Sequence, residues 1–561
     1  PIDERPHFPF GVNEFIAYCQ TVGAEPLMNV SEFIGTPQDS ADLVEYLNAP
    51  ADTKHPWAQK RAQWGHPEPF HVRYFEIGNE SDGKYTPEQY ALRFNECSRL
   101  MRAVDPTIKM SILMGTSTNP SADDPWNARV LTLTKGNADF IVIHTYAVCG
   151  LSTPDETMQS CMAIGDQFEY TLAQYRALIR KCTGRDIPLA ITEYNCGFVQ
   201  EKPIPYRFSY GAALFSADYL RILLKPETNV LMANYWQFIN GYWGMVRTSR
   251  DAATQQLAVR HMPAYYLYRL WGQHFGAQLL DVKVNSPRVQ FAGHVGNVCP
   301  AMGDHIVPAQ TSDTNLLQGK TIRTVNIPGL TTEVRPDGTL VATLDKLASE
   351  QYVSFVDIPA PSKGIGYHLS FEARATGTFT NAVMGLQLLD IRGWEATHSA
   401  IACEGIQKAT DWKEFNVTFN SITDSPGVSI CWRLIPKQNI PVSGTLEVRN
   451  LRITTNKPTT YPAYPAITAS ASRSADGKTV YLIVFNKHHA EDITTTIAVN
   501  GLGRRAHIRR WTVTGPSLTE TNLAEEAVRE TESGVAMQLS PKGTLTHTFP
   551  ARSMTAFEFS E

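Results

Sequence analysis

The chain has 561 residues, 43% of them hydrophobic and 19% charged, which is ordinary for a globular protein of several domains. Its formal net charge of −5 and the lack of a basic block argue against nucleic acid as a partner, and the lack of any run of about 18 apolar residues argues against a membrane-spanning helix. The nine cysteines are scattered without a C-x-x-C pair, so we expect neither a zinc site nor a disulfide scaffold, and spacing alone leaves open whether Cys149 and Cys161 are bridged.

Helical and strand patterns alternate between residues 11 and 251, which predicts parallel βα units. Thr86 at an N-cap, Pro87 at the first helical position and Glu88 in the first turn mark the start of one helix. Helices are expected at residues 11–23, 36–49, 86–105, 125–137, 166–182, 205–224 and 262–275. Buried strands are expected at residues 25–30, 73–80, 109–115, 140–147, 188–195 and 231–238.

Six parallel strands are two short of the eight that close a (β/α)8 TIM barrel, and an open sheet would leave backbone groups unpaired. The sequence begins with Pro1 and shows neither a starting Met nor a signal peptide. We therefore expect an N-terminally truncated, processed or split product. The first two barrel strands would come from residues outside this sequence or from another chain, and a homo-oligomer is one such arrangement.

The pattern changes after the barrel. Residues 277–310 lose the helical period, and short alternating strands follow in residues 311–456 and again in residues 466–561, as in β-sandwiches. A Pro-rich stretch at residues 457–465 separates these two regions. The fold class is therefore α/β plus all-β.

Two carboxylates stand at strand tips. The strand at residues 73–80 ends in Gly78, Asn79 and Glu80, and the strand at residues 188–195 carries Glu193 near its end. Carboxylates at the C-terminal ends of different strands of one barrel are what a retaining glycoside hydrolase needs, and such a pair lies about 5 Å apart. Either glutamate alone would be explained as well by a salt bridge, whereas both together favour catalysis. We interpret the mid-strand Glu76 as a structural partner for Arg73 or another cation.

Several stretches occur in the order that one family shows. They are FGVNEF at 10–15, GAEP at 23–26, GHPEP at 65–69, RYFEIGNE at 73–80, IHTY at 143–146, TEYN at 192–195 and QFIN at 237–240. This set resembles glycoside hydrolase family 51, whose best-known members are α-L-arabinofuranosidases, with some endoglucanases. The resemblance covers the barrel and implies a clan A retaining enzyme.

The resemblance also implies the domain organisation. Residues 1–276 would be the catalytic barrel, N-terminally incomplete, and residues 277–310 the first part of a C-terminal β-sandwich that residues 457–561 complete. The intervening residues 311–456 resemble an inserted jelly-roll carbohydrate-binding module. Within it we expect Trp394 to be an exposed platform and Trp412 and Trp432 to be core residues.

The family's site residues carry over to matching positions. Glu80 would be the acid/base and Glu193 the nucleophile, Asn79 would bind the sugar 2-hydroxyl, and Tyr146 would orient Glu193. The remaining expected contacts with substrate are His144, Trp236, Gln237 and Trp243, where the aromatic rings are either sugar platforms or barrel packing.

These features predict a retaining exo-acting α-L-arabinofuranosidase on plant cell-wall polysaccharide. The alternatives are an endo-β-1,4-glucanase or xylan-active endoglycanase of the same family and, from another class, a non-catalytic carbohydrate-binding protein. We expect no cofactor and no metal, and a secreted or periplasmic location.

Overall fold

The computed structural model describes residues 10–560 except for 115–124, 148–153, 166, 197–203, 251–252, 294–311, 363–364, 380–381, 398, 422–424, 438–439, 457–458, 461–462, 501–506, 534–536 and 542. The chain divides into two compact units. The first contains the chain up to Tyr146, Phe168–Tyr194 and Ile222–Trp236, and the second contains Ala147–Gln167, Asn195–Arg221 and Gln237–Glu561.

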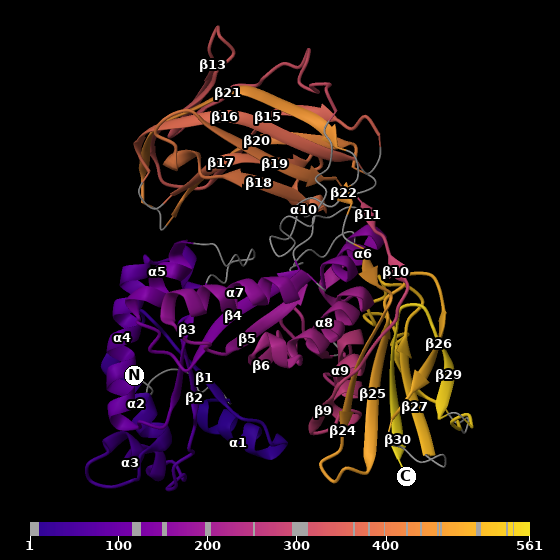
Figure 1. The fold of residues 1–561 in the computed structure, drawn as a ribbon. Helices are drawn as coiled ribbons and strands as arrows, with labels where there is room; N and C mark the ends of the chain where they lie inside the picture. The colour runs from indigo at the N-terminus through magenta and orange to yellow at the C-terminus, as the bar shows by residue number, and fades with distance from the viewer. Residues whose placement is uncertain are drawn as a thin grey trace. The chain divides into compact units, whose positions relative to one another are not determined.

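The first unit is built on a sheet of six strands (Figure 1). Their order in the sheet is their order in the chain: β1 (Leu27–Val30), β2 (Tyr74–Ile77), β3 (Lys109–Leu113), β4 (Phe140–Ala147), β5 (Leu189–Cys196) and β6 (Val230–Tyr235). The pairs β1–β2, β2–β3, β3–β4 and β5–β6 are parallel. The six strands expected from the buried apolar runs are confirmed.

Helices flank this sheet. They are α1 (Val12–Val22), α2 (Pro37–Asn48), α3 (Pro56–Gln63), α4 (Pro87–Val104), α5 (Pro125–Leu133) and α7 (Gln167–Thr183). The predicted N-cap Thr86 accepts the amide of Gln89, so α4 begins where the sequence indicates. The short α3 was not predicted; it is held by the buried Arg61, which donates to the carbonyl oxygens of Tyr46, Ala49 and His66.

Strands β1 and β6 are the edges of the sheet, and no described strand pairs with the outer side of either. None of the six residues of β6 is fully buried, and Leu231 is 45% exposed. The central strand β4 differs, because all eight of its residues are buried. The described part of the chain therefore contains an open parallel half-barrel sheet.

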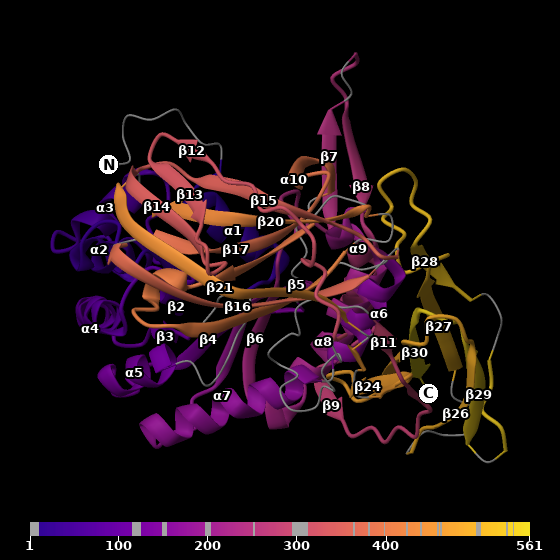
Figure 2. The same ribbon diagram turned by 90° about the horizontal axis from the view of Figure 1, so that it is seen from above.

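The second unit contains α6 (Pro154–Gly165), α8 (Tyr210–Leu223), α9 (Pro263–Gln273) and a hairpin of β7 (Val246–Arg250) and β8 (Leu257–His261), labelled in Figure 2. The hairpin and α6 were not predicted. A 3-10 turn, η2 (Tyr206–Phe208), occupies the start of the helix expected at 205–224. No helix in the described ranges is both long enough and apolar enough to cross a membrane.

A β-sandwich joins two stretches that are far apart in the sequence. One sheet has the order β28 (Arg529–Glu532), β27 (His507–Thr514), β30 (Ser553–Ser560), β25 (Thr479–Asn486), β24 (Ile467–Arg473) and β9 (Gln278–Leu280), and a second pair is β26 (Ile493–Ala498) with β29 (Thr544–Phe549). Their apolar faces form one core that includes Ile497, Phe549 and Phe557. Two short pairs, β10 (Arg288–Val289) with β23 (Tyr464–Pro465) and β11 (Ala292–Gly293) with β22 (Thr459–Thr460), also join the two stretches.

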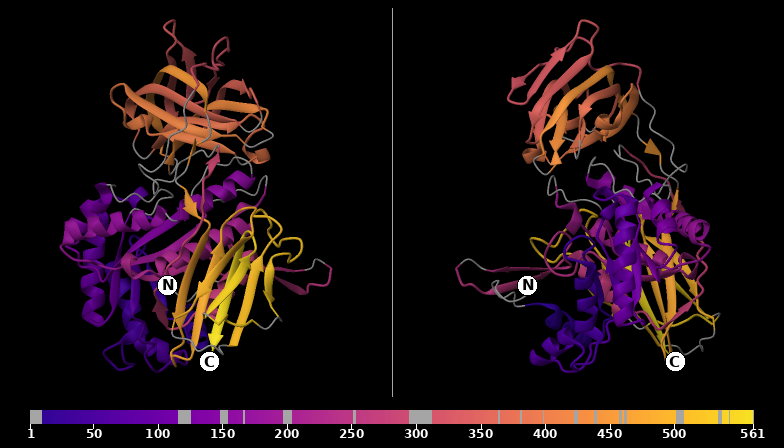
Figure 3. Two further views of the ribbon diagram at one scale, coloured as in Figure 1. Left: turned by 45° about the vertical axis from the view of Figure 1, so that its right-hand side comes forward. Right: turned by 90° about the vertical axis from the view of Figure 1, so that its left-hand side faces the viewer.

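Residues between these stretches form a second sandwich (Figure 3). One sheet contains β12 (Asn326–Ile327), β13 (Leu330–Val334), β14 (Leu340–Leu347), β21 (Val442–Asn456), β16 (Gly366–Thr378) and β19 (Lys413–Asn420). The other contains β15 (Gln351–Pro359), β20 (Gly427–Pro436), β17 (Ala382–Asp390) and β18 (Ala400–Glu404), with the one-turn α10 (Trp394–Thr397) after β17. The core between them includes Tyr367 of β16, Leu386 of β17 and Trp432 of β20.

The tryptophans of this sandwich differ in environment. Trp432 is buried and Trp394 is 44% exposed, as predicted. The prediction that Trp412 is a core residue is wrong, because its half-buried ring lies between the guanidinium groups of Arg374 and Arg449, at 4.6 and 4.1 Å. Two arginines beside the ring suit a polar surface rather than an apolar core.

One cysteine expectation falls outside the described residues. Cys149 is not among them, so the bridge considered between Cys149 and Cys161 stays untested. The Sγ atom of Cys161 lies 3.7 Å from that of Cys196, which is contact between thiols and not a bond.

Candidate active site

The turn after β2 holds Glu80 in an unusual backbone conformation. Gly78 has φ +92°, and a Cβ atom there would lie 2.8 Å from the Ser81 hydroxyl, so the position requires glycine. Glu80 itself is left-handed, with φ 48°. A side chain that reaches a site through a strained turn is a recurrent feature of functional positions.

Neighbouring elements hold this turn in place. The hydroxyl of Tyr90 on α4 donates to the carbonyl oxygen of Ile77 at 2.7 Å, and the Asn29 amide on β1 donates to that of Gly78 at 2.9 Å. The Ser81 hydroxyl donates to the buried Glu32 carboxylate at 2.8 Å. The sequence reasoning missed Asn29, Glu32 and Tyr90. The polar Asn29 among the apolar residues 27–30 was the one available signal.

Glu193 lies on β5 in a more enclosed place. Its side chain is 16% exposed, compared with 40% for Glu80. The Tyr146 hydroxyl on β4 donates to its Oε2 atom at 2.5 Å. This contact agrees with the predicted role of Tyr146 in orienting the carboxylate.

His144 stands between the two glutamates. It is buried, and its Nδ1 atom lies 3.1 Å from Oε1 of Glu80 and 3.6 Å from Oε2 of Glu193. One atom from each of the three side chains lies within 4.8 Å of the others. That separation matches the about 5–5.5 Å between the carboxylates of retaining glycosidases and is shorter than the about 6.5–9.5 Å of inverting ones.

Opposing contributions act on the pKa of Glu193. Burial raises the pKa of Glu193, whereas His144 and then the Tyr146 hydrogen bond lower it, and the charge of Glu80 raises it again. Burial and then the charge of Glu193 raise the pKa of the Tyr146 phenol, so that phenol stays a donor. His144 and Tyr146 therefore both favour the ionised, nucleophilic form of Glu193.

Glu76 is a third carboxyl group close to this site. It is buried on β2, and desolvation raises its pKa to about 7. Its hydrogen-bond partner is the Thr192 hydroxyl at 3.5 Å, not Arg73, whose guanidinium lies against the Tyr74 ring. The proposed pairing of Glu76 with Arg73 is thus wrong.

The other predicted contacts lie on loops. Asn79 is exposed at the strand tip beside Glu80. Trp236 is partly exposed directly after β6, and Gln237 accepts the amide of Tyr242 at 2.9 Å through its own side chain. Trp243 is buried. The structure brings Glu80, His144, Tyr146 and Glu193 together, while contacts of these four loop residues with substrate stay predictions.

A metal ion is one ligand that the cluster would accept. Glu80, His144 and Glu193 each present one ligand atom in the range that a divalent cation needs. Two carboxylates and one histidine are also an ordinary acid/base constellation, and the pKa balance at Glu193 needs no ion.

Curated relatives share part of this chain. An intracellular exo-α-(1→5)-L-arabinofuranosidase of Halalkalibacterium halodurans is 27% identical over 258 residues, which are 41% of this chain and 49% of the relative. One of the same description from Streptomyces lividans is 25% identical over 300 residues, 50% of this chain and 44% of the relative. An exo-α-(1→6)-L-arabinofuranosidase of Bifidobacterium longum is 27% identical over 281 residues, 43% of this chain and 53% of the relative. The chain thus spans about half the length of these relatives.

The expectation of a secreted or periplasmic protein is contradicted by these names. The relatives from Halalkalibacterium halodurans and Streptomyces lividans, and one from Bacillus subtilis, are named intracellular. Among the described residues, Cys19, Cys97, Cys403 and Cys431 are buried free thiols, which agrees with a reducing compartment.

Solved structures share the fold over nearly the whole chain. A family 51 α-L-arabinofuranosidase from Thermotoga petrophila covers 98% of this chain and 78% of its own, with a TM-score of 0.60 and 20% identity. An arabinose complex of the α-L-arabinofuranosidase from Thermotoga maritima gives a TM-score of 0.59 at 20% identity, with 99% of this chain and 79% of that chain covered. At this identity the likeness establishes the fold.

Two family models match the sequence itself. The α-L-arabinofuranosidase 1 domain matches residues 7–150, which contain Glu80 and His144, and the α-L-arabinofuranosidase C-terminal domain matches residues 193–553. The second match alone spans more than half of the chain and begins at Glu193. The chain therefore belongs to the α-L-arabinofuranosidase family, glycoside hydrolase family 51.

Proposed function

We propose that the protein is a retaining α-L-arabinofuranosidase. The observation that carries the proposal is the approach of the Glu80 and Glu193 carboxylates to within 4.8 Å, with His144 between them. This spacing suits a double displacement. An inverting mechanism needs a water molecule between the substrate and the second carboxylate, and therefore a separation of about 6.5–9.5 Å between the two carboxyl groups.

In the first step Glu193 attacks the anomeric carbon while Glu80 protonates the departing glycosidic oxygen. The Tyr146 hydroxyl, at 2.5 Å from Oε2 of Glu193, keeps that carboxylate oriented. In the second step Glu80 takes a proton from water, which attacks the glycosyl ester and frees Glu193 with overall retention. In this proposal Asn79, the exposed residue directly before Glu80, binds the 2-hydroxyl in both steps.

The proposed substrate is an arabinofuranosyl side chain of plant polysaccharide or an oligosaccharide, cleaved from the exposed end. The names of the relatives support exo action, since three of them are exo-arabinofuranosidases for (1→5) or (1→6) linkages. The same names, with the free thiols, support an intracellular enzyme that acts on imported oligosaccharides.

The open edges of the half-barrel sheet are places where further strands would complete the barrel of the enzyme. The outer edges of β1 and β6 carry backbone groups that pair with no described strand. Two further parallel strands, from residues outside this sequence or from another chain, would close a (β/α)8 barrel there. The open edge of β6, with Leu231 exposed, supports this part of the proposal.

The test is hydrolysis of 4-nitrophenyl α-L-arabinofuranoside by the full-length protein, beside the viscosity of carboxymethylcellulose and arabinoxylan solutions. We expect release of nitrophenol and no fall in viscosity. A rapid fall in viscosity with little nitrophenol would make the protein an endoglycanase. Binding of arabinosides without any turnover would leave a carbohydrate-binding protein.

A further inference from the structure

The four-stranded sheet β15–β20–β17–β18 of the second sandwich (Figure 1) has a polar outer face. Core residues alternate along these strands with residues that point outward. Four outward positions stand opposite one another in register, one on each strand: Tyr352, Arg433, Gly385 and Glu404. This row, called the Arg433 row below, crosses four strands and is roughly 14 Å long. The catalytic role proposed above uses none of its residues.

The Arg433 side chain joins the members of the row. Its Nε atom donates to Oε1 of Glu404 at 2.7 Å, past Gly385, which has no side chain. Its Nη1 atom donates to the Tyr352 hydroxyl at 3.3 Å and to Oε1 of Gln387 at 3.1 Å. The guanidinium also lies 5.4 Å from the centre of the Tyr352 ring. The side chains of the row are therefore held in one arrangement.

Gln387, two residues after Gly385 on the same face, keeps a donor for a ligand. The residue is only 8% exposed. Because a guanidinium only donates, the Gln387 atom that Arg433 meets is the amide oxygen, and the amide nitrogen points elsewhere. No acceptor lies against this nitrogen among the residues that the structure describes, and it is not one of the fully enclosed atoms. A donor of this kind suits an oxygen atom of a ligand.

The two ends of the row are open to solvent. The Tyr352 side chain is 48% exposed, and its hydroxyl donates to Glu350 at 3.2 Å. The Glu404 side chain is 41% exposed and uses Oε1 for Arg433, so within the described chain its Oε2 atom is an acceptor without a donor. The row thus presents a ring, a donor and an acceptor.

The outer face of the six-stranded sheet differs, because its polar groups are saturated. The Trp412 ring lies between the guanidinium groups of Arg374 and Arg449. Both carboxylate oxygens of Glu447 and both of Glu372 accept hydrogen bonds from neighbouring side chains. That face offers neither an open ring nor a free acceptor at these residues, so the Arg433 row is the better place for a ligand.

The chemistry of the row narrows the ligand. Sugar hydroxyl groups both donate and accept, and the C–H faces of sugars pack against aromatic rings. Arg433 is paired with Glu404, and Glu350 adds a negative charge, so the row does not favour an anion. Its length exceeds one sugar ring. We propose that the Arg433 row binds a stretch of a neutral polysaccharide chain, with Tyr352 against a sugar ring and Gln387 and Glu404 on hydroxyl groups.

Binding at this row is independent of the proposed hydrolysis. The test is calorimetric titration of the full chain, in saturating L-arabinose, with β-1,4-xylohexaose, cellohexaose, hexagalacturonate and xylose. The two neutral hexasaccharides lack an arabinofuranosyl group for the proposed active site to cleave. We expect at least one of them to bind about tenfold more tightly than hexagalacturonate or xylose, because neither of these matches both the charge and the length of the row.

Two variants test the residues of the row. We expect Tyr352→Ala to weaken binding of the neutral hexasaccharide about tenfold or more, and Tyr352→Phe, which keeps the ring, to retain most of it. Gln387→Met removes the free donor at similar length and should cost about five- to tenfold. Trp412→Ala, on the other sheet, is the matched aromatic control and should bind as the wild type does. Circular dichroism should show all variants folded.

Three results would overturn the assignment. Absence of binding by both neutral hexasaccharides would leave the row a plain polar surface. Equal or tighter binding of hexagalacturonate would show an anion site. Loss of binding in Trp394→Ala, with full binding in a folded Tyr352→Ala, would place the ligand at α10 instead. Turnover of aryl arabinosides is measured separately and should be unchanged in Tyr352→Ala, so failure of the proposed hydrolysis would leave the binding result standing.

Discussion

The two strand ends that carry Glu80 and Glu193 are built differently. Glu193 emerges within a regular, buried strand and is held by Tyr146 and His144. Glu80 stands on a left-handed turn after β2, is more than twice as exposed, and has His144 as its near partner. One carboxylate is fixed and enclosed, and the other lies on a turn open to solvent.

This difference fits the two tasks of a retaining glycosidase. A nucleophile must keep its position and charge, and the hydrogen bond from Tyr146, with His144 at 3.6 Å, favours both at Glu193. An acid/base group must exchange protons with a leaving group and then with water, which an exposed side chain does readily. The two environments thus suit the different roles that we propose for these two residues of the same chemical type.

Replacement of the enclosed carboxylate should have the largest effect. We predict that Glu193→Ala lowers kcat of the full-length enzyme by about 10⁴-fold or more, as loss of a covalent nucleophile does. Azide should restore turnover of 4-nitrophenyl α-L-arabinofuranoside and give the azide product of inverted configuration, as NMR would show. A folded variant with near-normal activity would remove Glu193 from the mechanism.

Replacement of the exposed carboxylate should depend on the leaving group. We predict that Glu80→Ala slows the hydrolysis of arabino-oligosaccharides by about 10²–10⁴-fold, because these leaving groups need a proton. Nitrophenyl arabinosides should be affected much less, since nitrophenolate leaves without one. Kinetics on aryl arabinosides of graded leaving-group pKa would show this slope, and an equal loss on all substrates would assign Glu80 another role.

The hydroxyl of Tyr146 donates to Glu193 and so accounts for part of the difference in environment between Glu193 and Glu80. Its hydrogen bond lowers the pKa of Glu193, so Tyr146→Phe should raise that pKa and shift the acidic limb of kcat/KM to higher pH. Loss of a hydrogen bond to a charged group costs about 1.5–3 kcal/mol, so we expect about a 10- to 100-fold loss of rate. Tyr74→Phe is the matched control, because Tyr74 is the first residue of β2, at the opposite end of that strand from Glu80, and it should leave the pH profile unchanged. An unshifted acidic limb in Tyr146→Phe would show that the hydroxyl is not what keeps Glu193 ionised.

Much of the scaffold of this site follows from the sequence. The six strands were expected from apolar runs in the sequence, although β6 at the open edge is not buried in the structure. Parallel strands bring their C-terminal ends to one edge of a sheet, so Glu80 and Glu193 were expected to meet. His144 and Tyr146 lie two residues apart on β4, and side chains with that spacing share one face of a strand. Their common approach to Glu193 was therefore foreseeable.

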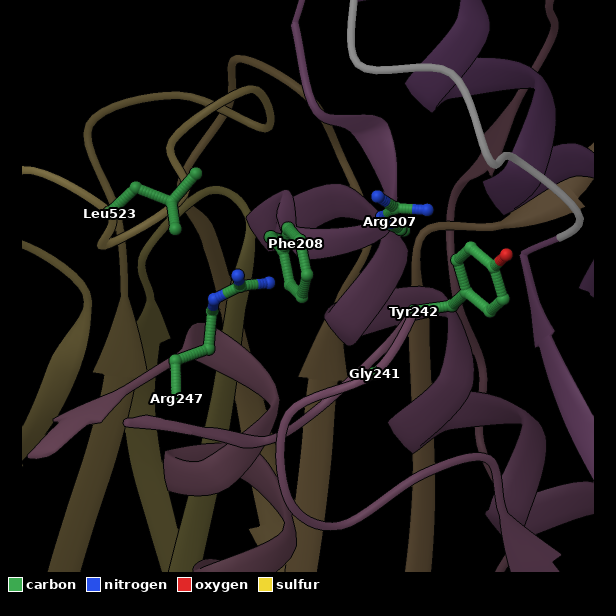
Figure 4. Close-up of a pocket in the computed structure, with 6 residues that line it drawn as sticks. All are labelled: Arg207, Phe208, Gly241, Tyr242, Arg247 and Leu523. Atoms are coloured by element: carbon green, nitrogen blue, oxygen red, sulfur yellow. The ribbon is translucent and has the colours of Figure 1, made fainter. Parts of the chain in front are cut away.

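Other features depend on contacts that no local pattern shows. The hydrogen-bond partner of Glu76 proved to be Thr192, which is 116 residues away. Arg73, directly before β2, is exposed and lies against the Tyr74 ring instead. The hairpin of β7 and β8 is rich in polar and exposed residues, so its alternation was too weak to predict it. A small pocket of the second unit likewise has described lining residues from segments far apart in the sequence, namely Arg207, Phe208, Gly241, Tyr242, Arg247 and Leu523 (Figure 4).

Glu76, the third carboxyl group near the site, gives the smallest expected effect, which is a change in how stability depends on pH. Desolvation raises the pKa of Glu76 from 4.5 to about 7, so the folded state favours its protonated form. The stability that this group contributes is full below about pH 4.5 and is lost as the pH rises through 7, because the folded state then has to hold a buried charge.

Glu76→Gln resembles the protonated form at every pH. We predict that the variant gains stability over the wild type as the pH rises from 5 to 8, by a few kcal/mol at most at about 1.4 kcal/mol per pKa unit. Urea midpoints of the variant and the wild type, measured at several pH values, would test this. If the difference between Glu76→Gln and wild type is the same at pH 5 and pH 8, Glu76 is ionised throughout and its burial is compensated by His144.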